Sequence, residues 1–200
     1  MKKILFLLIG VIVIIFVGTQ TLGQKITTTI KISSKNNQVL TTPSEKTTAS
    51  FIIPTTLSIP KISITVPVES VGMDAKGRMD VPSDEDNVAW YNLGFKPGEK
   101  GSAVIDGHFD KASGEPAVFY KLSSLRAGDK ITLTGDNGEQ MAFTVLRLQY
   151  YDFDAFPLQE VFNTTDKPRL NLITCEGEWN KKTLNYSKRL VVYSELTSST

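Results

Sequence analysis

Residues 170–196 read LNLITCEGEWNKKTLNYSKRLVVYSEL, and this stretch decides the fold class. Side chains alternate from Leu170 to Cys175 with a period of two, which is typical of a half-buried strand. A second β-rich run covers Leu190 to Tyr193. Cys175, the only cysteine in the chain, ends the first run, and Arg189 opens the second. Residues 176–178 are polar and turn-like, so we expect the thiol at the exit of a strand rather than in the middle of the core.

The only histidine, His108, lies in the segment AVIDGHFD, residues 103–110. The apolar run before it predicts a strand over residues 102–106 that carries the imidazole to the end of a sheet, and Gly107 permits a close backbone approach. Asp110 is either a hydrogen-bond partner that fixes the tautomer of His108 or a solvated loop charge. A lone cysteine is most often a small buried hydrophobe, and a lone histidine is usually a surface or satisfied core group.

One thiol, one imidazole and one guanidinium are nevertheless the groups that acyl transfer requires. A thiolate attacks a carbonyl carbon, an imidazole moves protons, and the guanidinium of Arg189 can meet the developing oxyanion. An idle free thiol outside the cytoplasm is also exposed to oxidation. These residues therefore indicate a cysteine-nucleophile enzyme.

The composition excludes several other classes of protein. The chain has 200 residues, 40% of them hydrophobic, and a formal net charge of +1, which fits one ordinary globular domain and gives no electrostatic case for nucleic acid. A single cysteine excludes an internal disulfide and any multi-cysteine metal site. We expect no metal and no cofactor.

The N-terminus predicts attachment to a membrane. Lys2 and Lys3 precede an apolar run over residues 4–17, which residues 19–23 can extend toward the length of about 17–25 residues that a spanning helix needs. We interpret residues 1–23 as an uncleaved anchor with its N-terminus inside and the rest of the chain outside the cytoplasm. The alternative is a cleaved signal peptide, although no convincing cleavage site follows.

Residues 24–50 are rich in Thr, Ser and Lys and predict a flexible linker, so the folded domain is expected over residues 51–200. Short strands dominate that domain, and their frequent turn signals favour a barrel or a sandwich. Strands are expected over residues 57–60, 62–66, 102–106, 130–134 and 140–149, with a tight turn at residues 136–138 between the last two. Short helices are expected over residues 84–90, capped by Ser83, and over residues 117–122.

Thr174-Cys175 after an alternating strand, with Arg189 opening the next, resembles the Leu-x-Thr-Cys…Arg signature of sortases, the membrane-anchored transpeptidases of bacterial surfaces. Upstream segments match in the same order, and together with Gly-His-x-Asp they most resemble class F sortases. These segments are Trp90-Tyr91, residues 97–101 (PGEKG), 107–110 (GHFD), 116–122 (PAVFYKL) and 125–129 (LRAGD). Two departures follow the cysteine: Glu176-Gly177 stands where two glycines are frequent, and Trp179-Asn180 replaces an aromatic-acid pair.

The resemblance implies an all-β fold, a closed eight-stranded β-barrel with short helices, in which Cys175 ends the seventh strand and Arg189 begins the eighth. It implies that Cys175 is the nucleophile, His108 the general acid/base and Arg189 the group that stabilises the oxyanion or orients the substrate. Thr174 and Glu176, the neighbours of the cysteine, would contact or support the substrate.

The implied substrate is a sorting signal of the Leu-Pro-x-Thr-Gly kind near the C-terminus of a secreted protein. Cys175 would hold that protein as a thioester until an amine of the cell envelope or of a pilin resolves it, and water would give peptidase activity instead. The sequence names neither the exact motif nor the acceptor.

Two other readings remain at this point. The L,D-transpeptidases of peptidoglycan are also cysteine acyl-transferases, but they keep Ser-His-Gly-Cys together, whereas His108 lies far upstream of Cys175. A non-catalytic adhesion or wall-binding β-domain would equally explain the anchor and the linker, but it has no use for Cys175, His108 and Arg189 together.

Overall fold

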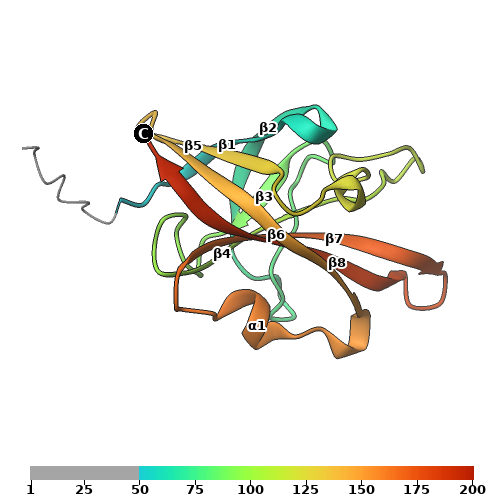
Figure 1. Ribbon diagram of the computed structural model, residues 1–200. Helices are drawn as coiled ribbons and strands as arrows, with labels where there is room; N and C mark the ends of the chain where they lie inside the picture. Colours follow the sequence, from blue (N-terminus) through green and yellow to red (C-terminus); the bar gives the residue numbers. More distant parts are fainter. Residues whose placement is uncertain (1–49) are drawn as a thin grey trace, which may run out of the picture. The chain divides into compact units, whose positions relative to one another are not determined.

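Eight strands close into one barrel in the order β1-β2-β3-β4-β7-β8-β6-β5 (Figure 1). The computed structural model describes residues 50–200. The strands are β1 (Pro54–Ile59), β2 (Ile64–Val71), β3 (Val88–Tyr91), β4 (Gly101–Gly107), β5 (Lys130–Gly135), β6 (Gln140–Asp152), β7 (Pro168–Asn180) and β8 (Asn185–Ser199). Helical turns are few and short: η1 (Pro60–Ile62), η2 (Leu122–Ser124), η3 (Phe153–Ala155) and α1 (Leu158–Phe162). The predicted closed eight-stranded barrel is confirmed.

The barrel interior is filled by alternate residues of each strand. Ile131 and Leu133 of β5 and Met141 and Phe143 of β6 are fully buried, and the residues between them are more exposed. This alternation is what a closed sheet with one inner face requires. The predicted hairpin between these two strands is confirmed, and Gly138 supplies the positive φ (82°) of its turn.

A second apolar cluster covers part of the outer face of the barrel. Val104 of β4, Ile173 of β7 and Val191 of β8 pack there with Val161 of α1. The connection from β6 to β7 passes over this face through η3 and α1, and Figure 1 shows α1 beneath the central strands. The side-chain amide of Asn171 donates a hydrogen bond of 2.6 Å to the carbonyl of Val161, which fixes α1 on the strand that carries the cysteine.

The β7–β8 hairpin is longer than the sequence predicted. β7 continues past Cys175 to Asn180, and β8 begins at Asn185 rather than at Arg189. The polar residues 176–178 are not a turn: Glu176 still pairs with Lys188, and a bulge follows it. Pairing resumes at Trp179 opposite Tyr186, with the two rings 5.2 Å apart. The buried part of β7 ends at Thr174, and Cys175 after it is half-buried although the strand continues. The thiol therefore lies where β7 leaves the core.

The predicted helix at residues 84–90 is wrong. Residues 84–87 form a turn, and Val88 opens β3. This strand pairs with β2 on one side and β4 on the other, and its first three side chains are buried. The helix expected at residues 117–122 is a turn followed by η2. β2 also runs through Pro67 to Val71, because its pairing with β3 begins after the proline. At β2 and β3 strand pairing overrides the local propensity.

Residues 1–23 and most of 24–50, assigned above to an anchor and a linker, lie outside the described residues. Within residues 50–200 no helix is long and apolar enough to cross a membrane.

Candidate active site

A groove of about 1150 Å³ lies on the outer face of the barrel, and it contains all three residues that the sequence singled out for chemistry. Its floor comes from the ends of β4, β7 and β8, which bring His108, Cys175 and Arg189 to one place. One wall is the connection from β2 to β3, and the other is the segment of η3 and α1. Residues on these walls include Asp80, Val81, Phe153, Phe156, Leu158 and Phe162.

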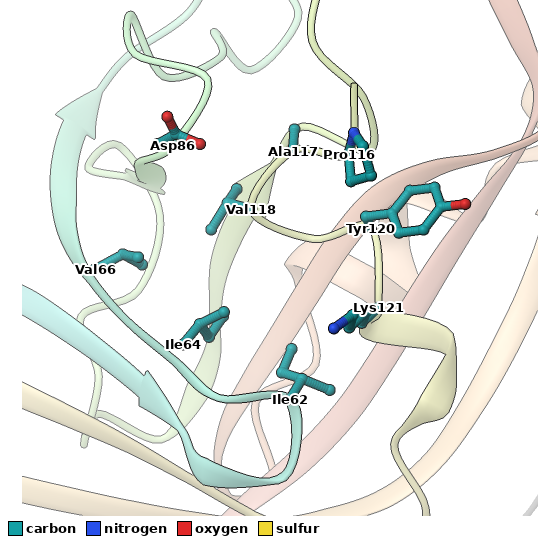
Figure 2. Close-up of a pocket in the computed structure, with 9 residues that line it drawn as sticks. All are labelled: Ile62, Ile64, Val66, Asp86, Pro116, Ala117, Val118, Tyr120 and Lys121. Atoms are coloured by element: carbon teal, nitrogen blue, oxygen red, sulfur yellow. The ribbon is translucent and has the colours of Figure 1, made fainter. Parts of the chain in front are cut away.

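A second, smaller hollow of about 280 Å³ lies elsewhere on the barrel. Figure 2 shows aliphatic side chains of Ile62, Ile64 and Val66 on one side of it and Pro116, Ala117, Val118 and Tyr120 on the other. Asp86 and Lys121 are its only charged lining residues, and none of the three chemistry-bearing residues reaches it. The larger groove is therefore the candidate active site.

Cys175 and Arg189 are direct partners across the β7–β8 pair. Because side chains alternate along β7, Ile173 and Cys175 face the groove side. The buried hydroxyl of Thr174, between them, donates a hydrogen bond of 2.8 Å to the carbonyl of Gly107. This bond joins the strand of the cysteine to the residue before His108, so it holds the two reactive groups on a common frame.

His108 follows directly after β4, as predicted, and the glycine before it is required by packing. A Cβ at Gly107 would lie 2.7 Å from the ring of Phe119 and 2.9 Å from Val118. The backbone amide of Phe119 donates to the carbonyl of His108 at 2.9 Å, which secures the loop. Nε2 of His108 lies 3.4 Å from the carbonyl oxygen of Pro82, a long contact to which a ring N–H can contribute only as the donor.

Asp110 is not the partner of His108. Its carboxylate instead accepts a hydrogen bond from the hydroxyl of Tyr186. Burial and then this hydrogen bond raise the pKa of Tyr186 to about 12. The ring of Tyr186 also lies 5.6 Å from that of Phe109. The loop that carries His108 is thus fastened to the β7–β8 hairpin through Asp110 and Phe109.

The guanidinium of Arg189 is held at the edge of the groove by three acceptors and one ring, and the longest of these bonds runs 3.4 Å from Nη1 to the carbonyl of Tyr186. Nη2 donates to Oδ1 of Asn185 at 2.7 Å, Nη1 donates to the carbonyl of Lys188 at 2.9 Å, and the group lies 4.7 Å from the centre of the Phe153 ring. Asn185 and Phe153 were not identified from the sequence, since neither carries a motif or a reactive group.

Burial raises the pKa of the Cys175 thiol above its ordinary value. The positive charge of Arg189 opposes this shift, whereas Asp106 and Asp110 add to it. The thiol is therefore protonated at neutral pH before substrate binds, and forming the nucleophile requires a base. Glu176, the other neighbour of the cysteine, is half-buried, and its carboxylate accepts a hydrogen bond of 3.4 Å from the amide of Gly177.

Asp106 is a groove residue that the sequence analysis passed over. It lies at the end of β4 and lines the same cavity as the cysteine. Its signal was present in the sequence, as a carboxylate that directly follows the buried run of β4. Nowhere in residues 50–200, the groove included, is a group of three or more His, Cys, Asp or Glu side chains placed to hold a metal ion.

A thiol, an imidazole and a guanidinium in one groove of a closed β-barrel are the groups expected at the active site of a cysteine acyl-transferase. Residues 57–197 match the family model of the sortase domain, so the chain belongs to the sortase family, the cysteine transpeptidases. No curated protein matches the sequence.

Solved structures agree on the fold. Sortase C1 of GBS pilus island 1 is 20% identical with a TM-score of 0.54 over 72% of this chain and 64% of that one. Listeria monocytogenes sortase A is 20% identical with a TM-score of 0.55 over 75% and 90% of the two chains. Corynebacterium diphtheriae sortase A is 20% identical with a TM-score of 0.55 over 74% of this chain and 62% of its own length. This chain thus spans less than two thirds of the length of sortase C1 and of the Corynebacterium diphtheriae enzyme. The likeness to class F sortases stays a prediction.

Proposed function

We propose that this sortase cleaves a C-terminal sorting signal of the Leu-Pro-x-Thr-Gly kind and transfers the acyl part to an amine, through a thioester on Cys175. The observation that carries the proposal is the convergence of His108, Cys175 and Arg189 on one groove from three distant places in the chain. The particular motif rests on the resemblance to class F sortases described above.

The reaction follows from the roles of the three groups. His108 takes the proton of the Cys175 thiol, the thiolate attacks the carbonyl carbon, and Arg189 stabilises the oxyanion. The C–N bond then breaks, and the leaving amine takes the proton from His108. In the second half an acceptor amine gives a proton to His108 as it attacks the thioester, and Cys175 leaves and recovers its proton. Water in place of the amine gives the hydrolysed peptide.

The acceptor in this proposal is an amine of the cell envelope or the lysine of a pilin, and the donors are secreted proteins that carry the signal. The alternative, a non-catalytic adhesion or wall-binding domain, does not explain why His108, Cys175 and Arg189 share one groove. Incubation of the protein with a sorting-signal peptide and a small primary amine, followed by mass analysis of the products, tests the proposal. We expect the amide of the acyl fragment; an uncleaved peptide under all conditions, with or without thiol alkylation, would support the adhesion domain.

Arg189→Lys should lower kcat/KM by about 10²–10³, the loss typical of an oxyanion donor. Lysine keeps the charge, but a single ammonium cannot replace the planar fork that bonds Asn185 and the carbonyl of Lys188 while facing the groove. The measurement is the initial rate of peptide cleavage, with exposed Lys188→Ala as a matched control on the same strand. Full activity of Arg189→Lys would make Arg189 a structural residue, and the amide of Glu176 would become the first candidate for the oxyanion donor.

We further propose that residues 1–23 hold the protein in the membrane with the catalytic domain outside the cytoplasm, because two lysines precede an apolar run. Intact mass of the protein isolated from membranes should equal that of the full chain, apart from the initiator methionine. A mature N-terminus near residues 20–25 would indicate a cleaved signal peptide and a secreted enzyme instead.

A further inference from the structure

Near the end of β4, one carboxyl oxygen, Oδ1 of Asp106, is enclosed and has no hydrogen-bond partner in the described part of the chain. Ala103 and Ile105 belong to the barrel core and Val104 to the outer cluster, so Asp106, two residues after Val104, lies on the outer side with the groove. Its Oδ1 is inaccessible to solvent and accepts no hydrogen bond from any residue in the described part of the chain. No side chain donates to either oxygen of this carboxyl among the hydrogen bonds of residues 50–200.

The enclosed Oδ1 destabilises the folded protein, since this oxygen has given up water without gaining a partner, although the residue as a whole is only half-buried. Burial raises the pKa of the Asp106 carboxyl well above its ordinary value; the backbone N–H of Asp106 itself opposes this shift, Asp80 adds to it, and Arg189 opposes it. The groups that face Asp106 are therefore Asp80 from the β2–β3 connection, Cys175 from β7 and Arg189 from β8. An enclosed, unpaired carboxyl oxygen on a residue that also lines the groove beside the reactive groups indicates a carboxyl placed to accept a hydrogen bond from the substrate.

The strand register places Asp106 close to the reaction centre. β4, β7 and β8 are neighbours, Asp106 is opposite Ile173, and Arg189 is opposite Cys175. One strand spacing of about 4.8 Å and two residues of about 3.3 Å each separate the backbone of Asp106 from that of Cys175, about 8 Å in all. A bound peptide advances about 3.3–3.6 Å per residue, so a group within about two residues of the scissile bond reaches Asp106.

Asp106 and Arg189 also lie on opposite sides of β7. Arg189 carries only donors, which suit the carbonyl oxygens of an extended peptide, and Asp106 offers the acceptor that the peptide's N–H groups need on the other side. We propose that Asp106 is a specificity-determining residue that accepts a hydrogen bond from the sorting peptide within about two residues of the scissile bond. This inference rests on the proposed function, and it assigns the groove a preference for a donor-bearing peptide over an aliphatic one at that point.

The test compares Asp106→Leu, which removes the acceptor and keeps the number and branching of side-chain heavy atoms, with Asp106→Asn, which keeps the acceptor. Exposed Asp152→Leu on β6 is the matched control for the loss of a carboxyl. With the full chain and a Leu-Pro-x-Thr-Gly peptide, we expect kcat/KM to fall at least about tenfold for Asp106→Leu and to stay within about threefold for Asp106→Asn and Asp152→Leu.

The donor is located by peptides that lack one hydrogen-bond donor each, with a backbone N–H replaced by an ester oxygen or a side-chain hydroxyl replaced by a methyl group. One such peptide should lose rate with the wild type and lose little more with Asp106→Leu, because the two changes remove the same bond. Additive losses at every position, or an unchanged rate for Asp106→Leu, would overturn the inference. Absence of turnover by the wild type would instead contradict the proposed function.

Thermal unfolding separates recognition from a structural role. Because the carboxyl is unsatisfied in the free protein, Asp106→Leu should raise the Tm at neutral pH while it lowers activity. The raised pKa means that Asp106 is neutral in both states at low pH and weakens folding only as the unfolded carboxyl ionises, so the gain in Tm should grow from about pH 4 upward. A fall in both Tm and activity would make Asp106 a structural residue and refute the proposal.

Discussion

Cys175→Ala should abolish both cleavage of a sorting-signal peptide and transfer of its acyl part to an amine. No other thiol exists in the chain to take over the attack, and alanine offers no nucleophile. The half-buried position of Cys175 at the edge of the core accommodates the smaller side chain, so the fold should persist. The measurement is peptide cleavage followed over hours at high enzyme concentration, with circular dichroism to confirm the barrel.

Cys175→Ser is the companion variant, since it keeps the shape and offers a weaker nucleophile. It should show no detectable acyl-enzyme, here an oxygen ester, and at most a trace of turnover. Cleavage by Cys175→Ala at the wild-type rate would remove covalent catalysis from the account and leave another group, such as a bound water, as the attacking species.

His108→Ala should lower the rate of cleavage by about 10²–10⁴, the usual contribution of general acid–base catalysis. Two features of the groove make the imidazole necessary. Burial raises the pKa of the Cys175 thiol, so the thiolate must be formed by a base, and the amine that leaves the tetrahedral intermediate must receive a proton. The thioester should still form slowly, because the nucleophile remains.

A matched control is Ser113→Ala, at an exposed position of the loop that follows His108. Single-turnover measurements with an activated ester substrate, whose leaving group needs no proton, should show a smaller defect in His108→Ala, because only the need for a base remains. An equal defect on both substrates would mean that His108 positions the loop rather than moving protons.

Much of the barrel follows from sequence periodicity, and the deviations have physical causes. The β5–β6 hairpin was predictable because alternating apolar residues and a tight Asn-Gly turn are local signals. β3 was missed because Val88, Ala89 and Trp90 are too few to show a period, and they become a strand only through their partners on β2 and β4. The extension of β7 and β8 was missed because a solvated ribbon has polar residues on both faces.

The candidate site shows the same division between local and long-range information. His108, Cys175 and Arg189 were identifiable because their side chains carry the chemistry. Tyr186 as the partner of Asp110, and Asn185 as the partner of Arg189, depend on the course of the hairpin, which no local pattern specifies. Asp106 was visible as a carboxylate after a buried strand, but only the barrel shows that its Oδ1 is enclosed and unpaired.

The central claim is that an acyl group passes through Cys175, and the most direct measurement is the mass of the intact protein after brief mixing with a sorting-signal peptide in the absence of amine. The account predicts an adduct equal to the acyl fragment, located on Cys175 by peptide mapping, discharged by added amine with formation of the amide, and absent from Cys175→Ala. Rapid cleavage of the peptide with no adduct at any time, or with an adduct on another residue, would contradict it.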